Sequence, residues 1–269
     1  MANFGGGDDF RTPAQSTDQS TCDPTVDVWP LRFDPSVSPW VPFSYTHVEY
    51  LEGDLFGMVM AIASLLPIFI VVSFATLIIF RRDLHTMAFF AGTLLNEAVN
   101  FILKRGLGHL RPCTDRKHHG SKYAMPSNHS QFVWFFSVYL VLFLFVRLRM
   151  SIAAPKFHVF VWVWKTAVAL GAVAAACIVS YSRAYLHYHS SQQVIFGSVL
   201  GAVLGVAWFF VVQNLLTPVF PVIASWRVSE FLLVRDTTLI PNVIFFEYTK
   251  EREETSSRLR KLRPANRSH

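Results

Sequence analysis

Long apolar stretches dominate the chain and predict helices that cross a membrane. A spanning helix needs about 20 consecutive, mostly apolar residues. Residues 55–80 meet this requirement without one charged side chain, and they end at Arg81-Arg82-Asp83. The pattern therefore predicts an all-α, polytopic membrane helical bundle. Its five spans cover residues 55–80, 84–103, 127–146, 166–181 (lengthened backward by 159–164) and 194–212.

The segment after the fifth span is less regular. Residues 215–224 are too short to cross a bilayer and contain two prolines. A sixth span within 228–246 would have to bury Arg235 and Asp236, and intramembrane charges are costly. We therefore expect residues 215–246 to form a re-entrant or interfacial segment.

The two ends of the chain differ in composition from its middle. Residues 1–44 begin polar, contain Gly5-Gly6-Gly7 and lack the apolar core of a signal peptide. Residues 247–269 hold seven Lys and Arg against four Glu. We expect a flexible N-terminal tail over 1–44, a membrane-embedded domain over 45–246 and a basic tail over 247–269.

The overall composition agrees with a membrane protein. The 269 residues are 52% hydrophobic and only 16% charged, whereas soluble domains carry roughly 25% charged residues. The 25 Phe and 7 Trp exclude a disordered chain, and three Cys are too few for a disulfide scaffold. No basic stripe interleaved with stacking aromatics is present, so we expect membrane lipids rather than nucleic acid as partners.

The basic residues also predict an orientation. Five spans put the two termini on opposite sides, and basic loops favour the cytoplasm. We expect the cytoplasmic side to carry the basic tail, Arg81, Arg82, Arg147, Arg149 and Lys156. The acidic N-terminus and the loops 104–126 and 182–190 then lie on the other side. The loop 104–126 is itself basic, and this local breach of the rule suggests a function.

Three short segments carry residues suited to chemistry, and the span pattern places them all at the non-cytoplasmic face. They are Lys104 separated by six residues from Arg111-Pro112, then Pro126-Ser127-Asn128-His129, and Ser182-Arg183 separated by five residues from His189. Taken singly, each fits a plainer explanation, a solvated cationic loop or an interfacial histidine. Their joint occurrence at one face favours a shared site.

The residue types in these segments suit a phosphate. Guanidinium and ammonium groups match its oxygens. Ser127 and the N–H groups at the start of the third span can donate to the same oxygens, because a helix N-terminus favours an anion. One imidazole can attack phosphorus while the other protonates the leaving oxygen. Together the segments predict phosphoryl transfer.

The three segments resemble the signature of the type-2 phosphatidic acid phosphatase superfamily, over about residues 55–212. A closer resemblance, over about residues 45–250, is to one branch of this superfamily. Its members lie in the endoplasmic reticulum and hydrolyse dolichyl diphosphate. This closer resemblance is carried by residues 47–50, 77–80, 125–127, 129–132 and 229–243.

The resemblance implies roles for the matching residues. His189 is expected to be the nucleophile that forms a phosphohistidine, and His129 the general acid that later helps to activate water. Lys104, Arg111 and Arg183 are expected to hold the phosphate, with Ser127 donating a hydrogen bond. No metal or other cofactor is expected.

The resemblance also implies a place and a purpose. The expected reaction converts dolichyl diphosphate, a polyprenyl diphosphate, to dolichyl phosphate and inorganic phosphate at the lumenal face of the endoplasmic reticulum. This reaction would recycle the glycan carrier lipid for protein N-glycosylation.

Two residues depart from the superfamily pattern. Asn128 replaces the usual Gly of the second segment. Gln193 stands where many members have an Asp that orients the nucleophile, and an amide cannot offset the charge of an imidazolium. The orienting carboxylate is therefore either absent or supplied by another residue.

Glu97 is a candidate to supply that carboxylate. Thr93, Glu97, Asn100 and Lys104 share one face of a helix. Ionisable groups within spans face a protein interior or a wet cavity. The stripe either leads into the phosphate site or only bonds neighbouring helices, and the sequence leaves both open.

Other patterns are structural. Gly197, Gly201 and Gly205 follow His189 and Gln193 in steps of four, which predicts close helix packing. Cys22 and Cys113 share the predicted non-cytoplasmic side, so a disulfide is conceivable there.

Two alternatives to the expected function stay open. The same site could act on another lipid phosphate, as a phosphatase or a phosphotransferase. A lipid or anion transporter, with Asn96 and Glu97 along its path, is the alternative from another class.

Overall fold

The computed structural model describes residues 40–43, 48–109, 123–148, 155–240 and 243–262. Within this part of the chain, five helical units are long and apolar enough to cross a membrane, and they confirm the predicted spans. The units are Leu55–Arg81, Leu84–Leu107, Asn128–Arg147, Val159–Tyr185 and Ser191–Ala224.

The first unit is broken into two helices. Helix α1 (Leu55–Ala63) ends shortly before α2 (Leu66–Arg81) begins. Pro67 stands in the first turn of α2, where the N–H that proline lacks would have no intrahelical partner. The proline therefore starts a new helix inside an otherwise continuous apolar run.

The centre of the bundle is the pair α4 (Asn128–Leu142) and α6 (Ser191–Val211), with α3 (Leu84–Leu107) and α5 (Pro155–Tyr185) packed on α4. Helix α4 continues into a short π-helix, η2 (Phe143–Arg147). Aromatic rings fill the core that α4 and α6 share with α2 and α3. A buried cluster includes Phe74, Phe89, Phe135, Tyr139 and Phe209.

The glycine stripe of α6 lies against the backbone of α4, as predicted. A Cβ atom on Gly197 would approach the Ser127 carbonyl oxygen to 2.8 Å, and one on Gly201 would approach the Gln131 carbonyl oxygen to 2.2 Å. Real Cβ atoms do not come this close to an oxygen. The absence of a side chain at these positions therefore sets the distance between the two helices.

The fifth unit runs further than expected. Residues 215–224 continue α6 through η3 (Val212–Leu216), η4 (Thr217–Val219) and α7 (Phe220–Ala224), instead of starting a separate segment. The two prolines stand at the second residues of η4 and α7, where they do not interrupt a helix. After α8 (Arg227–Phe231), the described residues up to 240 contain no sixth span.

The end of the predicted N-terminal tail is ordered. Residues 40–43 form strand β1 (Trp40–Phe43), which pairs antiparallel with β2 (Val48–Leu51). Val48 and Tyr50 pack against a small apolar cluster, and this tertiary support explains why a segment without a helical pattern has a fixed structure. Residues 1–39 lie outside the described part of the chain.

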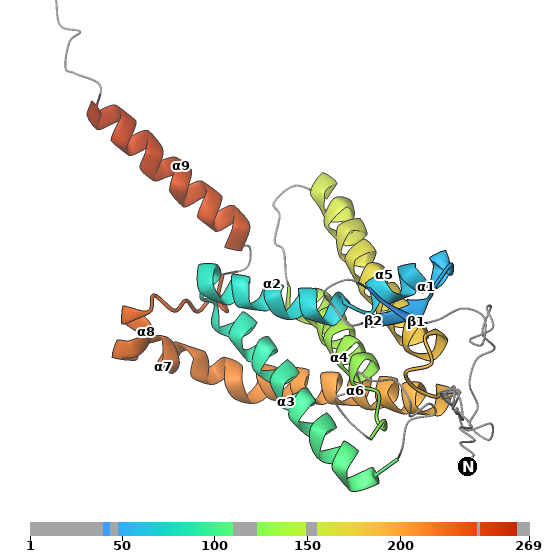
Figure 1. The fold of residues 1–269 in the computed structure, drawn as a ribbon. Coiled ribbons are helices and arrows are strands. Elements are labelled where there is room, and N and C mark those ends of the chain that lie inside the picture. The colour runs from blue at the N-terminus through green and yellow to red at the C-terminus, as the bar shows by residue number, and fades with distance from the viewer. Residues whose placement is uncertain (1–39, 44–47, 110–122, 149–154, 241–242, 263–269) are drawn as a thin grey trace, which may run out of the picture.

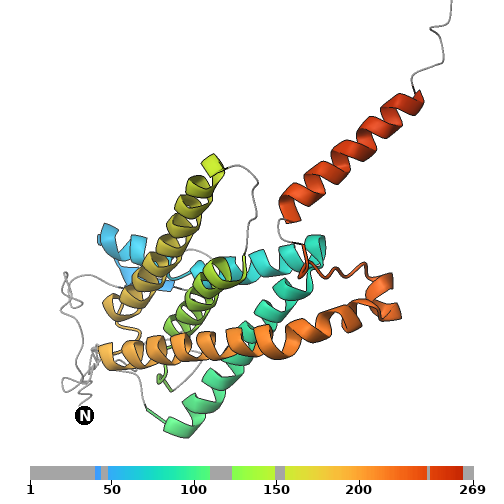
Figure 2. The same ribbon diagram turned by 180° about the vertical axis from the view of Figure 1, so that it is seen from behind.

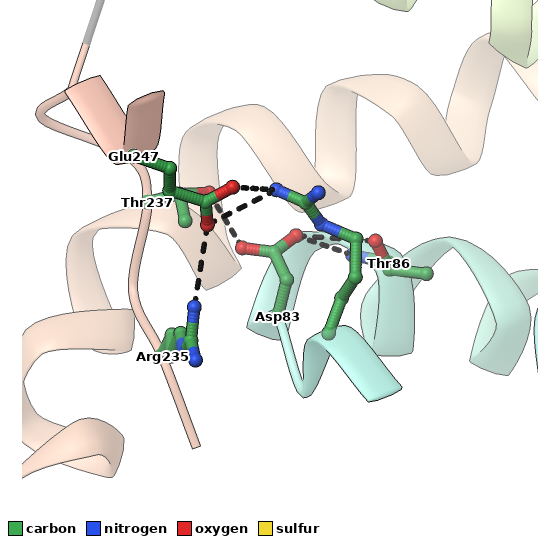
Figure 3. Close-up of polar contacts among 6 residues, drawn as sticks. Asp83, Thr86, Arg235, Thr237 and Glu247 are labelled. Carbon is green, nitrogen blue, oxygen red and sulfur yellow. Dashed lines mark hydrogen bonds and ion pairs between the residues drawn. The ribbon is translucent and has the colours of Figure 1, made fainter. Parts of the chain in front are cut away.

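The chain after α8 is fastened to the turn between α2 and α3 (Figure 3). The Arg235 N–H donates to the Arg82 carbonyl at 2.8 Å, and the Leu84 N–H donates to the Arg235 carbonyl at 3.0 Å. Asp83 caps α3 by accepting from the Thr86 N–H at 3.0 Å, and it also accepts from the Thr237 hydroxyl at 2.5 Å.

The last helix, α9 (Val243–Leu262), projects from the bundle in both views (Figures 1 and 2). Near its start, Glu247 forms ion pairs with Arg81 at 3.3 Å and with Arg235 at 3.2 Å. Arg147 at the end of η2 donates to the Thr238 carbonyl at 3.2 Å. These contacts place Arg81 beside the basic tail and Arg147 beside Thr238, at the end of the bundle opposite to the start of α4.

Candidate active site

The second and third sequence segments meet where α4 and α6 begin. The Ser127 N–H donates to the Gln193 carbonyl at 3.3 Å, and Ser127 is fully buried. His129 stands in the first turn of α4 and is half-buried, whereas His189 lies two residues before α6 and is buried. Both imidazoles therefore come from the same end of one tightly packed helix pair.

The first segment reaches the same end through α3. Lys104 is a half-buried residue in the last turn of α3, which ends at Gly108 with a left-handed φ of 63°. The chain returns beside this helix end, because the Ala124 N–H donates to the His109 carbonyl at 2.8 Å. Arg111 lies outside the described residues.

The third segment is a closed turn. The Arg183 carbonyl accepts from the Tyr188 N–H at 3.1 Å and from the His189 N–H at 3.2 Å. His187 within the turn has a left-handed φ of 57°, which few residues other than glycine adopt. The spacing of five residues between Arg183 and His189 is thus the length of a turn that holds both side chains near the start of α6.

Two tyrosines near this turn contact the N-terminal part of the chain, and one of them also contacts Arg183. The Arg183 guanidinium carbon lies 4.0 Å from the ring centroid of Tyr188. The Tyr188 hydroxyl accepts from the Glu49 N–H at 2.9 Å, and the Tyr185 hydroxyl donates to Asp54 at 2.7 Å. Sequence reasoning missed these contacts, although two aromatic residues between Ser182-Arg183 and His189 were a visible signal.

Gln193 belongs to a capping box. Its Oε1 accepts from the Ser190 N–H at 3.2 Å, and its own N–H donates to the Ser190 hydroxyl at 3.4 Å. Such reciprocal bonds satisfy N–H groups that a helix start leaves without partners. Gln193 therefore stabilises the backbone directly after His189, and the Ser-x-x-Gln spacing could have revealed this in the sequence.

The polar stripe on α3 divides between two partners. The Asn100 amide donates to Gln131 on α4 at 2.7 Å, and Gln131 donates back to Asn96 at 2.9 Å. Asn100 therefore bonds a neighbouring helix. Glu97 is hydrogen-bonded by the Asn128 side chain and interacts electrostatically with Lys104. It thus connects the first and second segments.

The electrostatics of this end of the bundle suit an anion. Lys104 and the buried Arg183 contribute positive charge. The N-termini of α4 and α6 lie side by side, and each stabilises a nearby negative charge by typically about 0.3–1 kcal/mol. Two imidazoles beside a bound phosphate can supply a nucleophile and a proton donor.

The described residues hold no group of three or more His, Cys, Asp and Glu side chains that could bind a metal ion. Cys177 is an exposed free cysteine. Cys22 and Cys113, whose pairing was conceivable from the sequence, lie outside the described residues.

Comparisons with known proteins show the family of the chain. The PAP2 superfamily matches residues 85–216. Dolichyldiphosphatase 1 of Mus musculus is 51% identical over 224 residues, which cover 83% of this chain and 93% of that protein. The human dolichyldiphosphatase 1 is 50% identical over the same shares. A crystal structure of a transmembrane PAP2-type phosphatidylglycerolphosphate phosphatase from Bacillus subtilis covers 60% of this chain and 79% of its own, with 21% identity and a TM-score of 0.48.

Proposed function

The chain belongs to the PAP2 superfamily and is a lipid pyrophosphate phosphatase, and we propose that its substrate is dolichyl diphosphate. The products are dolichyl phosphate and inorganic phosphate. The observation that carries the proposal is the hydrogen bond from Ser127 to Gln193, because it joins the segments of both histidines in a chain with 51% identity to a dolichyldiphosphatase. A cationic site at the end of a membrane bundle also suits a lipid whose tail stays in the bilayer.

The proposed reaction has two steps. His189 attacks the terminal phosphorus, and the bond from that phosphorus to the bridging oxygen breaks. His129 gives its proton to the bridging oxygen, so dolichyl phosphate leaves and a phosphohistidine remains. A water molecule then attacks the phosphohistidine while His129 takes up its proton, and inorganic phosphate is released.

The cations of the site bind the phosphoryl group during both steps. Lys104, Arg111 and Arg183 stabilise the charge that develops on its oxygens, and Ser127 donates a further hydrogen bond. Fixed donors of this kind do not need to reorganise when the reaction occurs.

We assign supporting roles to the residues around this centre. Asn128 takes the place of the superfamily Gly. Its bond to Glu97 supports a role for Asn128 and Glu97 together, which is to fix the start of α4 next to His129. Gln193 fixes the backbone after His189 through its capping box. Asn100 contributes by holding α3 to α4 through Gln131.

We further propose that the protein lies in the membrane of the endoplasmic reticulum with its site toward the lumen. The cluster of basic residues at the opposite end, which includes Arg81 and Arg147, supports a cytoplasmic position for that end and for α9. A lumenal site would return dolichyl phosphate for further rounds of protein N-glycosylation.

The substrate is tested with purified protein in detergent. Release of inorganic phosphate is measured from dolichyl diphosphate, phosphatidic acid, a sphingoid phosphate and a sugar phosphate at equal concentrations. We expect the highest kcat/KM for dolichyl diphosphate. A higher value for any other lipid contradicts the proposed substrate, and transfer of the phosphoryl group to an acceptor alcohol in place of water contradicts hydrolysis.

The His189→Ala variant separates an enzyme from a transporter. We expect it to lose turnover completely, because the nucleophile is gone. Flux of lipid or anion across proteoliposomes that persists in this variant, with no hydrolysis by the wild-type protein, is the result expected of a transporter.

A further inference from the structure

We propose that Tyr188 is a positioning residue that holds the Arg183 guanidinium in place, and that the β1–β2 hairpin anchors it. The inference rests on the proposed role of Arg183 in binding phosphate. It adds a residue and a structural element that the phosphoryl-transfer chemistry does not itself require. The hairpin also lies outside residues 85–216, which match the superfamily.

The contact between the two side chains is close and buried. The guanidinium carbon of Arg183 lies 4.0 Å from the centroid of the Tyr188 ring. Arg183 is 5% exposed and Tyr188 is 9% exposed. A cation over an aromatic face is attracted by the ring, and the attraction is strongest where water is excluded. The ring therefore restricts an arginine whose long side chain has many rotamers.

The ring is itself held from the far side. Its hydroxyl accepts from the Glu49 N–H of β2 at 2.9 Å, although 139 residues separate the two in sequence. Tyr188 also belongs to the buried cluster that includes Met60 and Ala61 of α1 and Leu186 of the turn. Figures 1 and 2 show the hairpin beside α1 and the end of α5 that carries Arg183.

The backbone completes a closed unit. The Arg183 carbonyl accepts the N–H groups of both Tyr188 and His189. The residue that holds the guanidinium is thus the neighbour of the proposed nucleophile, and both are tied to the same carbonyl. A guanidinium fixed in this way can meet the phosphoryl group without losing further side-chain freedom, which is the benefit of a preorganised site.

The test measures phosphate binding and turnover separately. Dissociation constants for inorganic phosphate are obtained by calorimetry on the full chain in detergent, and kcat and KM are obtained with dolichyl diphosphate. Tyr188→Leu removes the aromatic face, and we expect phosphate binding and kcat/KM to weaken about tenfold. Tyr188→Phe keeps the ring and loses the bond to Glu49, so we expect a smaller loss of about threefold.

Tyr185→Phe is the matched control. It also removes one tyrosine hydroxyl from the same turn, the one bonded to Asp54, but the ring on Arg183 is that of Tyr188. We expect phosphate binding to stay within about twofold of the wild-type value. Because Tyr188→Phe is nearly isosteric, it keeps the test informative if Tyr188→Leu does not fold.

A double-mutant cycle identifies Arg183 as the target. Arg183→Lys replaces the planar guanidinium by a point charge. In this background, Tyr188→Leu should have little further effect on phosphate binding. The inference is overturned if Tyr188→Leu weakens phosphate binding equally in both backgrounds. It is also overturned if Tyr188→Phe and Tyr185→Phe have equal effects on phosphate binding.

The two proposals fail in different ways. If the wild-type protein does not hydrolyse dolichyl diphosphate, the proposed function fails. The positioning role still stands in that case if Tyr188→Leu weakens binding of inorganic phosphate and Tyr185→Phe does not. If hydrolysis occurs but Tyr188→Leu and Tyr188→Phe both bind phosphate as the wild type does, the positioning role fails and the function stands.

Discussion

The backbone of Ser127 donates a hydrogen bond to the backbone of Gln193, over a distance of 3.3 Å. This bond joins the starts of two helices. The histidines proposed to act on a phosphate lie at these starts, His129 in the first turn of α4 and His189 two residues before α6. Gly197, one turn further along α6, has no side chain to keep the two backbones apart. The distance between α4 and α6 therefore determines how the two histidines are placed relative to each other.

The first prediction concerns that distance. A Cβ atom on Gly201 would lie 2.2 Å from the Gln131 carbonyl oxygen, so Gly201→Ala must move α6 away from α4. We expect a loss of stability of about 1–3 kcal/mol and a decrease of kcat by more than about tenfold. Thermal unfolding and steady-state kinetics measure these effects.

Gly171→Ala is the control for this substitution, because a Cβ atom at Gly171 on α5 meets nothing within 4 Å. Alanine is favoured over glycine in a helix interior by up to about 1 kcal/mol. We expect this variant to retain full kcat and unchanged or slightly higher stability. Equal kcat values for the two alanine variants would show that the spacing of α4 and α6 does not control catalysis.

The second prediction concerns the bond between Glu97 and Asn128. Glu97→Gln weakens the acceptor of the Asn128 side chain, and Asn128→Gly removes that side chain and introduces the superfamily residue. We expect Glu97→Gln to lower kcat in the wild-type background and to have much less effect in the Asn128→Gly background. A coupling energy of about 0.5–3 kcal/mol is typical of residues in contact, and additive effects would separate Glu97 from the second segment.

The sequence predicted the five spans of the fold and the common end of the bundle from which both histidines come. Hydropathy placed the five spans, and the order of the three segments indicated that His129 and His189 share one end of the bundle. The aromatic residues of the turn were visible in the sequence, but the contact of Tyr188 with Arg183 depends on a turn with a left-handed His187, which the sequence does not reveal. The bond from Glu49 depends on a hairpin that only tertiary packing stabilises.

Local signals explain the remaining differences in the fold. The first span is broken at Ser64-Leu65, directly before a helix that carries Pro67 in its first turn. The prolines after residue 215 stand at helix starts, where proline is tolerated, so the fifth unit continues to Ala224. All three prolines stand at the second residue of a helical element, where proline is tolerated.

The third prediction concerns pH. His189 must be neutral to attack phosphorus, and His129 must be protonated to donate to the leaving oxygen. The rate falls at low pH because protonated His189 has no lone pair to offer. It falls at high pH because deprotonated His129 has no proton to give, so kcat/KM should follow a bell-shaped curve. Ordinary imidazoles titrate near pH 6.5, and a rate that is constant from about pH 5 to pH 9 would contradict these two roles.

The fourth prediction, and the most direct test of the account, is the trapping of a phosphoenzyme. Protein is mixed with dolichyl diphosphate labelled in its terminal phosphate, quenched within one turnover in alkaline detergent, and digested for peptide mapping. We expect an acid-labile label on the peptide that contains His189, absent in His189→Asn and present in a His109→Asn control, since His109 is exposed at the end of α3. Label on another residue, or label that persists in His189→Asn, would contradict the central claim that this imidazole attacks the phosphate.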